Sequence, residues 1–174
     1  RQIKSLIRLI EDMLDISRIR TGKLSIRPSR FDLAQLVRGL VENFAPQVEA
    51  AQSSLSLQAE QPLEGNWDEF RIEQVVSNLL TNALRYGAKS PIEVRVYAQD
   101  GEARVEVRDH GIGISEDNQK RIFQQFERVS ANHVAAGLGL GLFISEQIVT
   151  AHGGAISVES RIGEGALFRV SLPL

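Results

Sequence analysis

Two asparagines and an arginine repeat at helical spacing within residues 75–86. Asn78, Asn82 and Arg85 occupy positions i, i+4 and i+7, so a helix would carry all three on one face. Asparagine is a weak helix former because its side chain competes for backbone groups, and two of them one turn apart favour a ligand site. Carboxamide oxygens suit Mg²⁺, which binds oxygen donors and substrate phosphates, and an arginine can meet a phosphate. A solvated polar stripe is the alternative.

An aspartate and two glycines directly follow a predicted strand, residues 103–108. Asp109 stands at the end of this strand, where a carboxylate can accept a hydrogen bond from an exocyclic amine such as that of adenine. Gly111 and Gly113 let the backbone turn sharply and approach a flat ligand. An ordinary aspartate turn is the alternative interpretation.

Three glycines alternate with leucines before a predicted helix. Gly137, Gly139 and Gly141 lead into residues 143–151, where free backbone N–H groups and the positive end of the helix dipole can cradle a phosphate. The run is not the dinucleotide fingerprint, which needs a strand just before it, nor a P-loop, which ends in Gly-Lys-Ser/Thr. A flexible hinge is the alternative.

Periodicity predicts the elements that position these residues. Helices are expected where apolar residues recur every three or four positions and strands where they alternate, with Asp32 capping the second helix. The expected helices are 1–20, 32–44, 68–86 and 139–152. The expected strands are 54–58, 92–98, 103–108, 155–160 and 166–172.

Turn signals divide these elements. Pro46 should kink or end the second helix, and Asp100-Gly101 between two alternating runs predicts a hairpin. Residues 61–66 are expected to form a loop. Residues 111–138 are irregular apart from an expected helical turn within 116–126, and so long a segment without clear structure is usually functional or mobile.

Composition excludes several classes of function. The net charge of −2 gives no electrostatic case for binding nucleic acid or an anionic membrane. The absence of cysteine excludes disulfides, thiol catalysis and cysteine-bound metal. No apolar run approaches the ~20 residues that span a bilayer. The chain opens at Arg1 in mid-pattern, so we expect it to be a piece of a larger protein. The absence of cysteine fits a cytoplasmic setting, and we expect this piece to be the cytoplasmic portion of a protein that a membrane could anchor elsewhere, without direct membrane contact of its own.

The first expected helix carries an apolar stripe that needs a partner. Either the rest of this chain or a helical bundle could cover it, and we favour the bundle. The stripe consists of Ile3, Leu6, Ile7, Ile10, Met13 and Leu14.

The order of these motifs resembles the catalytic, ATP-binding domain of sensor histidine kinases, in the GHKL superfamily shared with gyrase, mismatch-repair ATPases and large ATP-dependent chaperones. Residues 78–82 resemble the N box, 109–113 the G1 box, 123–128 the F box and 137–141 the G2 box. Residues 14–24 resemble the end of the dimerisation helix.

The resemblance implies an α/β (α+β) fold. It predicts a two-layer sandwich of one mixed sheet and about three helices, preceded by a helix from a dimerisation bundle. Residues 1–27 would be the end of the dimerisation helix and a linker, and 28–174 the catalytic domain. Nucleotide would lie between the helices and a lid at about 115–136.

The resemblance also implies roles for single residues. Asn82 is similar to the Mg²⁺ ligand, and Asn78 supports it near the phosphates of ATP. Arg85 matches a position that contacts phosphate, Tyr86 one that packs on adenine, and Asp109 the residue that fixes adenine. Phe123 and Phe126 would anchor the lid, and Gly139 and Gly141 would donate to the triphosphate. The other expected nucleotide contacts are Gly111, Gly113, Ile114, Gly137, Leu138 and Leu140.

The expected chemistry is phosphoryl transfer. Asn78 stands where gyrase-like hydrolases carry a glutamate that activates water, and transfer depends mainly on positioning and charge neutralisation. We interpret His110, His133 and His152 as non-catalytic; His152 ends a helix, where a cationic side chain suits the dipole. The phosphoacceptor would be a histidine on a dimerisation helix outside this chain.

The expected partners are the protein's own dimerisation and phosphoacceptor domain, a second copy in a homodimer, and the receiver domain of a response regulator. Two departures from the family, His110 and Ala166, leave nucleotide affinity open. A scaffold that has lost turnover and an ATP-hydrolysing conformational switch are the alternatives.

Overall fold

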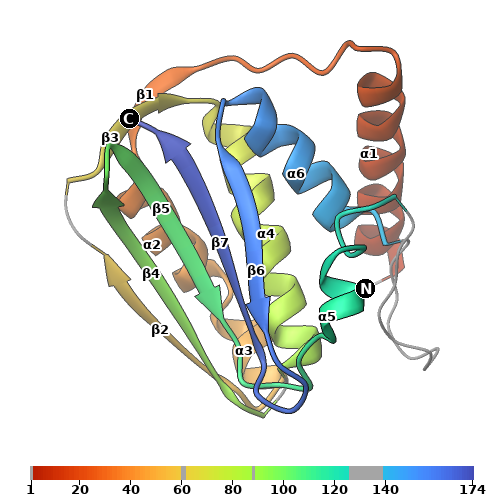
Figure 1. Cartoon of the computed structure of the whole chain (residues 1–174), viewed down its shortest axis with the longest axis vertical. Helices are drawn as coiled ribbons and strands as arrows, with labels where there is room; N and C mark the ends of the chain where they lie inside the picture. Colours follow the sequence, from red (N-terminus) through yellow and green to blue (C-terminus); the bar gives the residue numbers. More distant parts are fainter. Residues whose placement is uncertain (1, 60–61, 88, 126–138) are drawn as a thin grey trace.

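Figure 1 shows the computed structural model, which describes residues 2–59, 62–87, 89–125 and 139–174. Its centre is a five-stranded sheet in the order β2-β4-β5-β7-β6. The strands are β2 (Ser54–Ala59), β4 (Pro91–Gln99), β5 (Glu102–Arg108), β6 (Ala155–Ser160) and β7 (Ala166–Pro173). β2 and β4 are parallel and the other neighbours antiparallel, so the predicted mixed sheet is confirmed.

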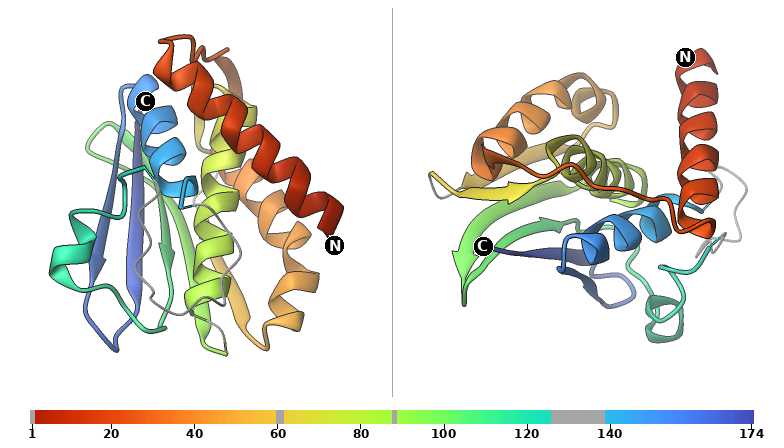
Figure 2. Two further views of the ribbon diagram at one scale, coloured as in Figure 1. Left: turned by 90° about the vertical axis from the view of Figure 1, so that its right-hand side faces the viewer. Right: turned by 90° about the horizontal axis from the view of Figure 1, so that it is seen from above.

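Helices cover one face of this sheet, which gives two layers (Figure 2). Asp32 and Asp68 cap α2 and α4, because their carboxylates accept from the N–H groups of Ala34 and Arg71. Pro46 is the second residue of α3, and only Phe44 separates α3 from the end of α2, as the fixed φ of proline predicts. The helices are α2 (Leu33–Asn43), α3 (Ala45–Ala50), α4 (Glu69–Tyr86) and α6 (Gly141–Ala151).

The core lies between the two layers. Alternate strand residues such as Val94, Val105 and Val170 face the helices and are almost fully buried, as are Leu79 of α4 and Ile148 of α6. The hairpin between β4 and β5 turns at Asp100 and Gly101, which both have positive φ. The predicted two-layer sandwich and its hairpin are therefore confirmed.

A second, two-stranded sheet was not foreseen. β1 (Ser29–Asp32) pairs with β3 (Glu64–Trp67), so the loop predicted for residues 61–66 is wrong over 64–66. Four residues that lack an apolar alternation become a strand only because a distant segment supplies the partner. Gly65 permits this packing, since a Cβ there would lie 2.0 Å from the Trp67 ring.

α1 (Gln2–Arg20) stands at the edge of the domain beside α6 (Figure 2). Its end is packed, with Ile16 only 6% exposed, whereas Ile3 is 74% exposed. The rest of the predicted apolar stripe is also exposed, so the described residues do not cover it. Within the described ranges, no helix is long and apolar enough to cross a bilayer.

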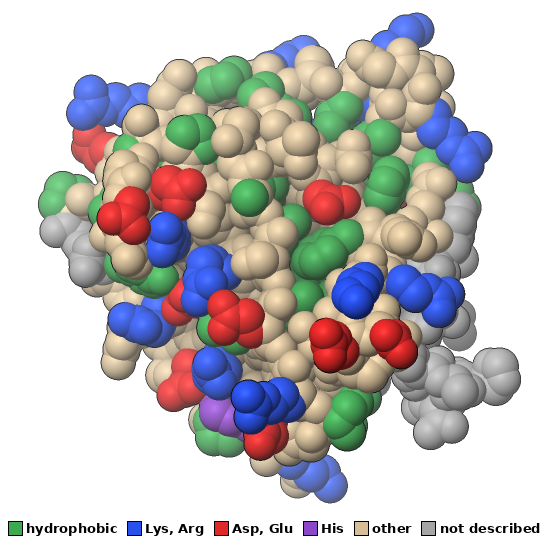
Figure 3. Space-filling view, viewed as in Figure 1, with side chains coloured by type: hydrophobic (Ala, Val, Ile, Leu, Met, Phe, Trp, Pro, Cys, Tyr) green, Lys and Arg blue, Asp and Glu red, His purple; other side chains and the backbone are tan. Residues whose placement is uncertain are grey.

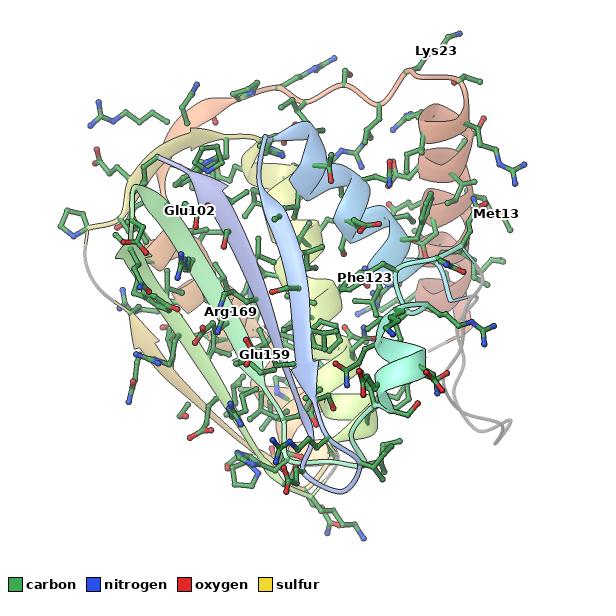
Figure 4. All side chains as sticks on the ribbon, viewed as in Figure 1. Met13, Lys23, Glu102, Phe123, Glu159 and Arg169 are labelled. Atoms are coloured by element: carbon green, nitrogen blue, oxygen red, sulfur yellow. The ribbon has the colours of Figure 1, made fainter. Side chains whose placement is uncertain are left out.

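The outer face of the sheet, which α2, α4 and α6 leave open, carries paired charges (Figure 3). Glu106 is 6% exposed there and accepts from Tyr97 and Arg169, while Arg169 also donates to its neighbour Glu159 (Figure 4). Burial disfavours the charged form of Glu106, but these hydrogen bonds outweigh it and leave the pKa of Glu106 below its usual value. This face is therefore a solvent-exposed surface on which charged side chains pair with one another.

Candidate functional site

The predicted asparagine helix is α4, and Asn78 lies where α4 meets the start of α6. Its side chain is buried, and its Nδ2 donates to Gly141 O at 2.6 Å and to Ser145 Oγ at 3.1 Å. A Cβ on Gly141 would lie 2.7 Å from both carboxamide heteroatoms, so glycine is needed for this approach. Two of the predicted motifs, far apart in sequence, therefore meet at one side chain.

An arginine that the sequence analysis did not single out bonds the oxygen of this carboxamide. Arg8 of α1 donates from Nη2 to Asn78 Oδ1 at 2.5 Å. These hydrogen bonds of Asn78 define one orientation, with Nδ2 toward α6 and Oδ1 toward α1. No feature of the sequence links Arg8, on the first helix, to a partner that lies 70 positions away.

The other polar residues of the predicted motif lie on the last turns of α4. Asn82 and Tyr86 are half-buried and Arg85 is exposed. Helix α4 ends at Tyr86, and Gly87 N–H bonds back to Ala83 O. These residues keep the helical spacing that the sequence predicted, while their ligand roles stay predictions.

The loop after β5 is held against the end of α4. Ile112 N–H donates to Tyr86 O at 3.4 Å, and a Cβ on Gly111 would lie 1.9 Å from that same oxygen. Gly87 also approaches this loop closely, because a Cβ on it would lie 2.7 Å from Asp109 Cβ. Glycine at these positions therefore brings the aspartate loop to the asparagine helix.

Asp109 is a buried carboxylate in this loop, 6% exposed. Its Oδ1 accepts from Gly111 N–H at 2.9 Å. Burial raises the pKa of Asp109 above its ordinary value, and the bond from Gly111 opposes that shift. A carboxylate kept in a site where its charge is disfavoured is typical of a functional group.

The next residues are anchored to the turn between β6 and β7. Gly113 has φ of 72°, and a Cβ there would lie 2.0 Å from Arg161 O. Ile114 N–H donates to Ser160 Oγ at 2.8 Å, and Ser160 Oγ donates to Gly165 O. The sequence had given Ile114 no such partner, and the contact fixes where the expected lid begins.

The described part of the expected lid is short. The expected helical turn over 116–126 is correct only for α5 (Glu116–Gln119), because the following residues up to 125 form turns. Phe123 is half-buried and meets Phe168 edge-on, with ring centroids 6.4 Å apart (Figure 4). The predictions for Phe126, Gly137, Leu138 and His133 lie outside the described residues.

The glycine-rich run leads into α6 as expected. Gly139 has φ of 70°, Leu140 is 1% exposed, and Gly141 is the first residue of α6. The side chain of Leu140 does not cap α6, so the first backbone N–H groups of this helix have no side-chain acceptor at the N-cap. Such a start favours an anion, and the nearby amide oxygens of Asn78 and Asn82 suit a divalent cation, so this donor set fits a nucleotide with its metal.

A second buried polar cluster lies at the start of α4, and sequence reasoning missed it. Arg71 is 8% exposed and its Nη1 lies 2.9 Å from both carboxylate oxygens of Asp15, on α1. Gln74 donates to Asp15 at 2.8 Å and accepts from Arg71. Asp15 and Arg71 are 56 positions apart, and no feature of the sequence pairs them.

The expectation for His152 was wrong in its charge. Its Nε2 accepts from Asp68 N–H at 3.0 Å, and its Nδ1 lies 2.8 Å from Ile148 O. A ring that accepts at one nitrogen and donates at the other is the neutral tautomer. His152 therefore joins the end of α6 to the start of α4 as an uncharged link, rather than as a cation at a helix end.

A family model described as Histidine kinase-, DNA gyrase B-, and HSP90-like ATPase matches residues 67–174. The chain is 35% identical over 175 residues to the alginate biosynthesis sensor protein KinB of Pseudomonas aeruginosa, covering 99% of this chain and 29% of KinB. It is 34% identical over 176 residues to the circadian input-output histidine kinase CikA of Synechococcus elongatus, covering 97% of this chain and 23% of CikA. The chain thus spans less than a third of these relatives.

Solved structures share the fold. Full-length ShkA in complex with AMPPNP aligns with a TM-score of 0.86 and 29% identity, covering 97% of this chain and 35% of ShkA. The catalytic domain of histidine kinase ThkA aligns with a TM-score of 0.75 and 27% identity, covering 84% of this chain and 95% of that domain. Since the matched model covers more than half of the residues, the chain belongs to the histidine kinase-, DNA gyrase B- and HSP90-like ATPase family, as the ATP-binding catalytic domain of a sensor histidine kinase.

Proposed function

We propose that residues 28–174 bind Mg-ATP and transfer its γ-phosphoryl group to a histidine on a dimerisation helix outside this chain, and that residues 1–27 are the end of the second such helix and a linker. One observation carries the proposal: the Asn78 carboxamide bonds the first residue of α6, while the Asp109 loop is packed on the end of the same helix α4. A cation site, an anion site and a buried acceptor therefore adjoin one another.

Each part of this site has its own task. Asp109 accepts from the adenine amine with the carboxylate oxygen that Gly111 does not engage. Tyr86 packs on the base, and Arg85 with the backbone of Gly139 and Gly141 holds the phosphates. Bound Mg²⁺ supplies charge neutralisation on the transferring phosphate.

We assign the remaining residues of the expected set to the same site. In this proposal Asn82 is the metal ligand, and Asn78 supports it near the phosphates and also holds the start of α6 in place. The residues that we assign to the nucleotide besides these are Gly111, Gly113, Ile114, Phe123, Phe126, Gly137, Leu138 and Leu140.

Transfer is favoured over hydrolysis by the residue at position 78. A carboxamide is not a base, so Asn78 cannot take a proton from water. Neither described histidine is placed as a phosphoryl acceptor. His152 is buried with both ring nitrogens engaged, and His110 Nε2 lies 3.1 Å from Glu93 Oε2. The acceptor is therefore best sought on a separate helix.

The partners follow from the same assignment. The relatives KinB and CikA are much longer than this chain, and ThkA is described in complex with the response regulator protein TrrA. We infer a homodimer through the apolar stripe of α1, and a receiver domain that takes the phosphoryl group. The ShkA structure holds AMPPNP, which makes that analogue a suitable probe.

The test is a titration of the whole chain with AMPPNP and Mg²⁺, comparing wild type with Asp109→Asn. In the variant, Oδ1 can keep the bond from Gly111, so an amide NH₂ then meets the adenine amine, donor against donor. Loss of a hydrogen bond to a charged group predicts affinity weaker by about ten- to a hundred-fold. Asp100→Asn is the matched control, because it makes the same change at an exposed turn.

Two results would overturn the proposal. One is the absence of AMPPNP binding by wild type. The other is labelled phosphate from ATP appearing on this chain alone, since no described histidine is an acceptor. With the preceding helix restored, phosphohistidine should form there and should be lost in Asp109→Asn.

A further inference from the structure

Helix α1 is attached to the catalytic domain at two polar points that differ in burial. At one, Asp15 and Arg71 form an ion pair whose side chains are 5% and 9% exposed. At the other, Arg8 reaches Asn78, and the Arg8 side chain is exposed. Both pairs are separated by seven residues on each helix, in opposite order, so the two helices run antiparallel along two turns.

Apolar packing is tighter at the first of these points. Ile16, beside the Asp15 pair, is buried, whereas near Arg8 Leu9 is half-buried and Ile7 and Ile10 are 50% and 52% exposed. The first half of α1 is therefore held by the Arg8 bond more than by a shared core. A ligand that competes for this bond can release that half of the helix and leave the other half in place.

The contested atom is Asn78 Oδ1. An amide can bind a cation only through its oxygen, and Asn78 Nδ2 is already committed to Gly141 and Ser145. Arg8 holds that oxygen at 2.5 Å, so a positive group already stands where Asn78 could offer an electron pair. A guanidinium and a divalent cation at one oxygen repel each other, whereas the guanidinium attracts a bare polyphosphate.

We propose that Arg8 is an internal competitor of the metal: it occupies Asn78 while α1 is attached, and a magnesium nucleotide must displace it and so release the first half of α1. This inference rests on the proposed function. It joins nucleotide binding to the freedom of the helix that carries the exposed apolar stripe, because the attached half and the stripe are the same segment. The Asp15–Arg71 pair keeps the second half in place throughout.

The first experiment compares AMPPNP binding by wild type, Arg8→Gln and Lys4→Gln, once with Mg²⁺ and once with EDTA. Lys4→Gln is the matched control, since it removes one positive charge from an exposed position one turn away on α1. We expect Arg8→Gln to bind the magnesium complex about three- to ten-fold more tightly, which corresponds to about 0.7–1.4 kcal/mol. In EDTA it should show no gain, and Lys4→Gln should match wild type in both media.

The second experiment follows amide hydrogen exchange. Magnesium AMPPNP should speed exchange within residues 6–12 of wild type and leave residues 15–19 unchanged. Without ligand, Arg8→Gln should already exchange faster over 6–12, because the bond to Asn78 is gone. Protection of residues 6–12 by the magnesium nucleotide would contradict the proposal.

The outcomes separate the two claims. If Arg8→Gln binds the magnesium complex more weakly than wild type, Arg8 is a phosphate ligand and the competition is refuted. Equal affinities in wild type and Arg8→Gln refute it as well. If wild type binds no analogue in either medium, the proposed function fails, and exchange in ligand-free Arg8→Gln still shows whether Arg8 holds the helix.

Discussion

The two ends of α4 both bury polar side chains, but they bury them against different kinds of partner. At the start, Arg71 meets the carboxylate of Asp15, and Asp68 accepts the N–H groups of Arg27 and Arg71. From the middle of the helix onward, Asn78 touches a glycine-rich helix start and an exposed arginine, and the last turn meets the Asp109 loop. Buried charge fully paired within the chain is structural, whereas we assign the buried polar groups beside loops packed through glycine to the proposed binding site.

The largest expected effect is at the structural end. Arg71→Leu leaves the Asp15 carboxylate buried without its cation, and removal of one partner from a buried pair costs about 3–5 kcal/mol. The free energy of unfolding, measured by urea denaturation, should fall by at most this amount, because release of α1 can return Asp15 to water.

The double variant Asp15→Leu/Arg71→Leu controls for the lost packing. It removes both charges, so it should be more stable than Arg71→Leu alone. A double variant that is less stable by the sum of the two single effects would show that the pair acts independently.

A smaller effect is expected at His152, also at the start of α4. His152→Ala leaves the buried N–H of Asp68 without an acceptor, which should cost about 1–3 kcal/mol by thermal or urea unfolding. His152→Gln offers an amide oxygen in place of Nε2 and should recover part of the loss. Equal losses in the two variants would mean that ring packing, and not the hydrogen bond, stabilises this joint.

At the proposed binding end, replacing a buried polar group should stabilise the folded chain, which is the opposite of the effect expected at the structural end. Burial raises the pKa of Asp109, so the folded chain carries a penalty for the charged carboxylate at neutral pH, and this penalty shrinks as pH falls through the raised pKa. Asp109→Asn removes the charge and should raise the melting temperature of the nucleotide-free chain at pH 7. Its advantage over wild type should fade toward acid pH. A melting temperature below that of wild type at pH 7 would contradict this.

Sequence could predict the elements at the proposed binding end of α4 because their signal is local. Asn78 and Asn82 share a helical face, Asp109 ends an alternating run, and Asp100-Gly101 joins two strands. The structural end depends on pairs such as Asp15 with Arg71, 56 positions apart, and charged residues on helices give no sign of their partner. The pairing of β1 with β3 failed for the same reason, since strand 64–67 has no pattern of its own.

The smallest expected effect comes from a glycine in α2, and a second glycine, in α6, provides the contrast. Gly39→Ala in α2 should raise the free energy of unfolding by about 0.5–1 kcal/mol, because a Cβ there meets nothing within 4 Å and alanine is the better helix former. Gly141→Ala gains the same propensity but drives a methyl against Asn78, which is buried and bonded on both sides. That crowding should cost about 1–3 kcal/mol and so exceed the gain.

Nucleotide binding makes this pair of variants decisive. Gly39→Ala should bind magnesium AMPPNP like wild type, whereas Gly141→Ala should bind it more weakly, since it displaces Asn78 and adds bulk at the start of α6. If Gly141→Ala were as stable as Gly39→Ala and bound normally, Asn78 would have room to move. The contact between α4 and α6 would then be loose packing, and the distinction between the two ends of α4 would not hold.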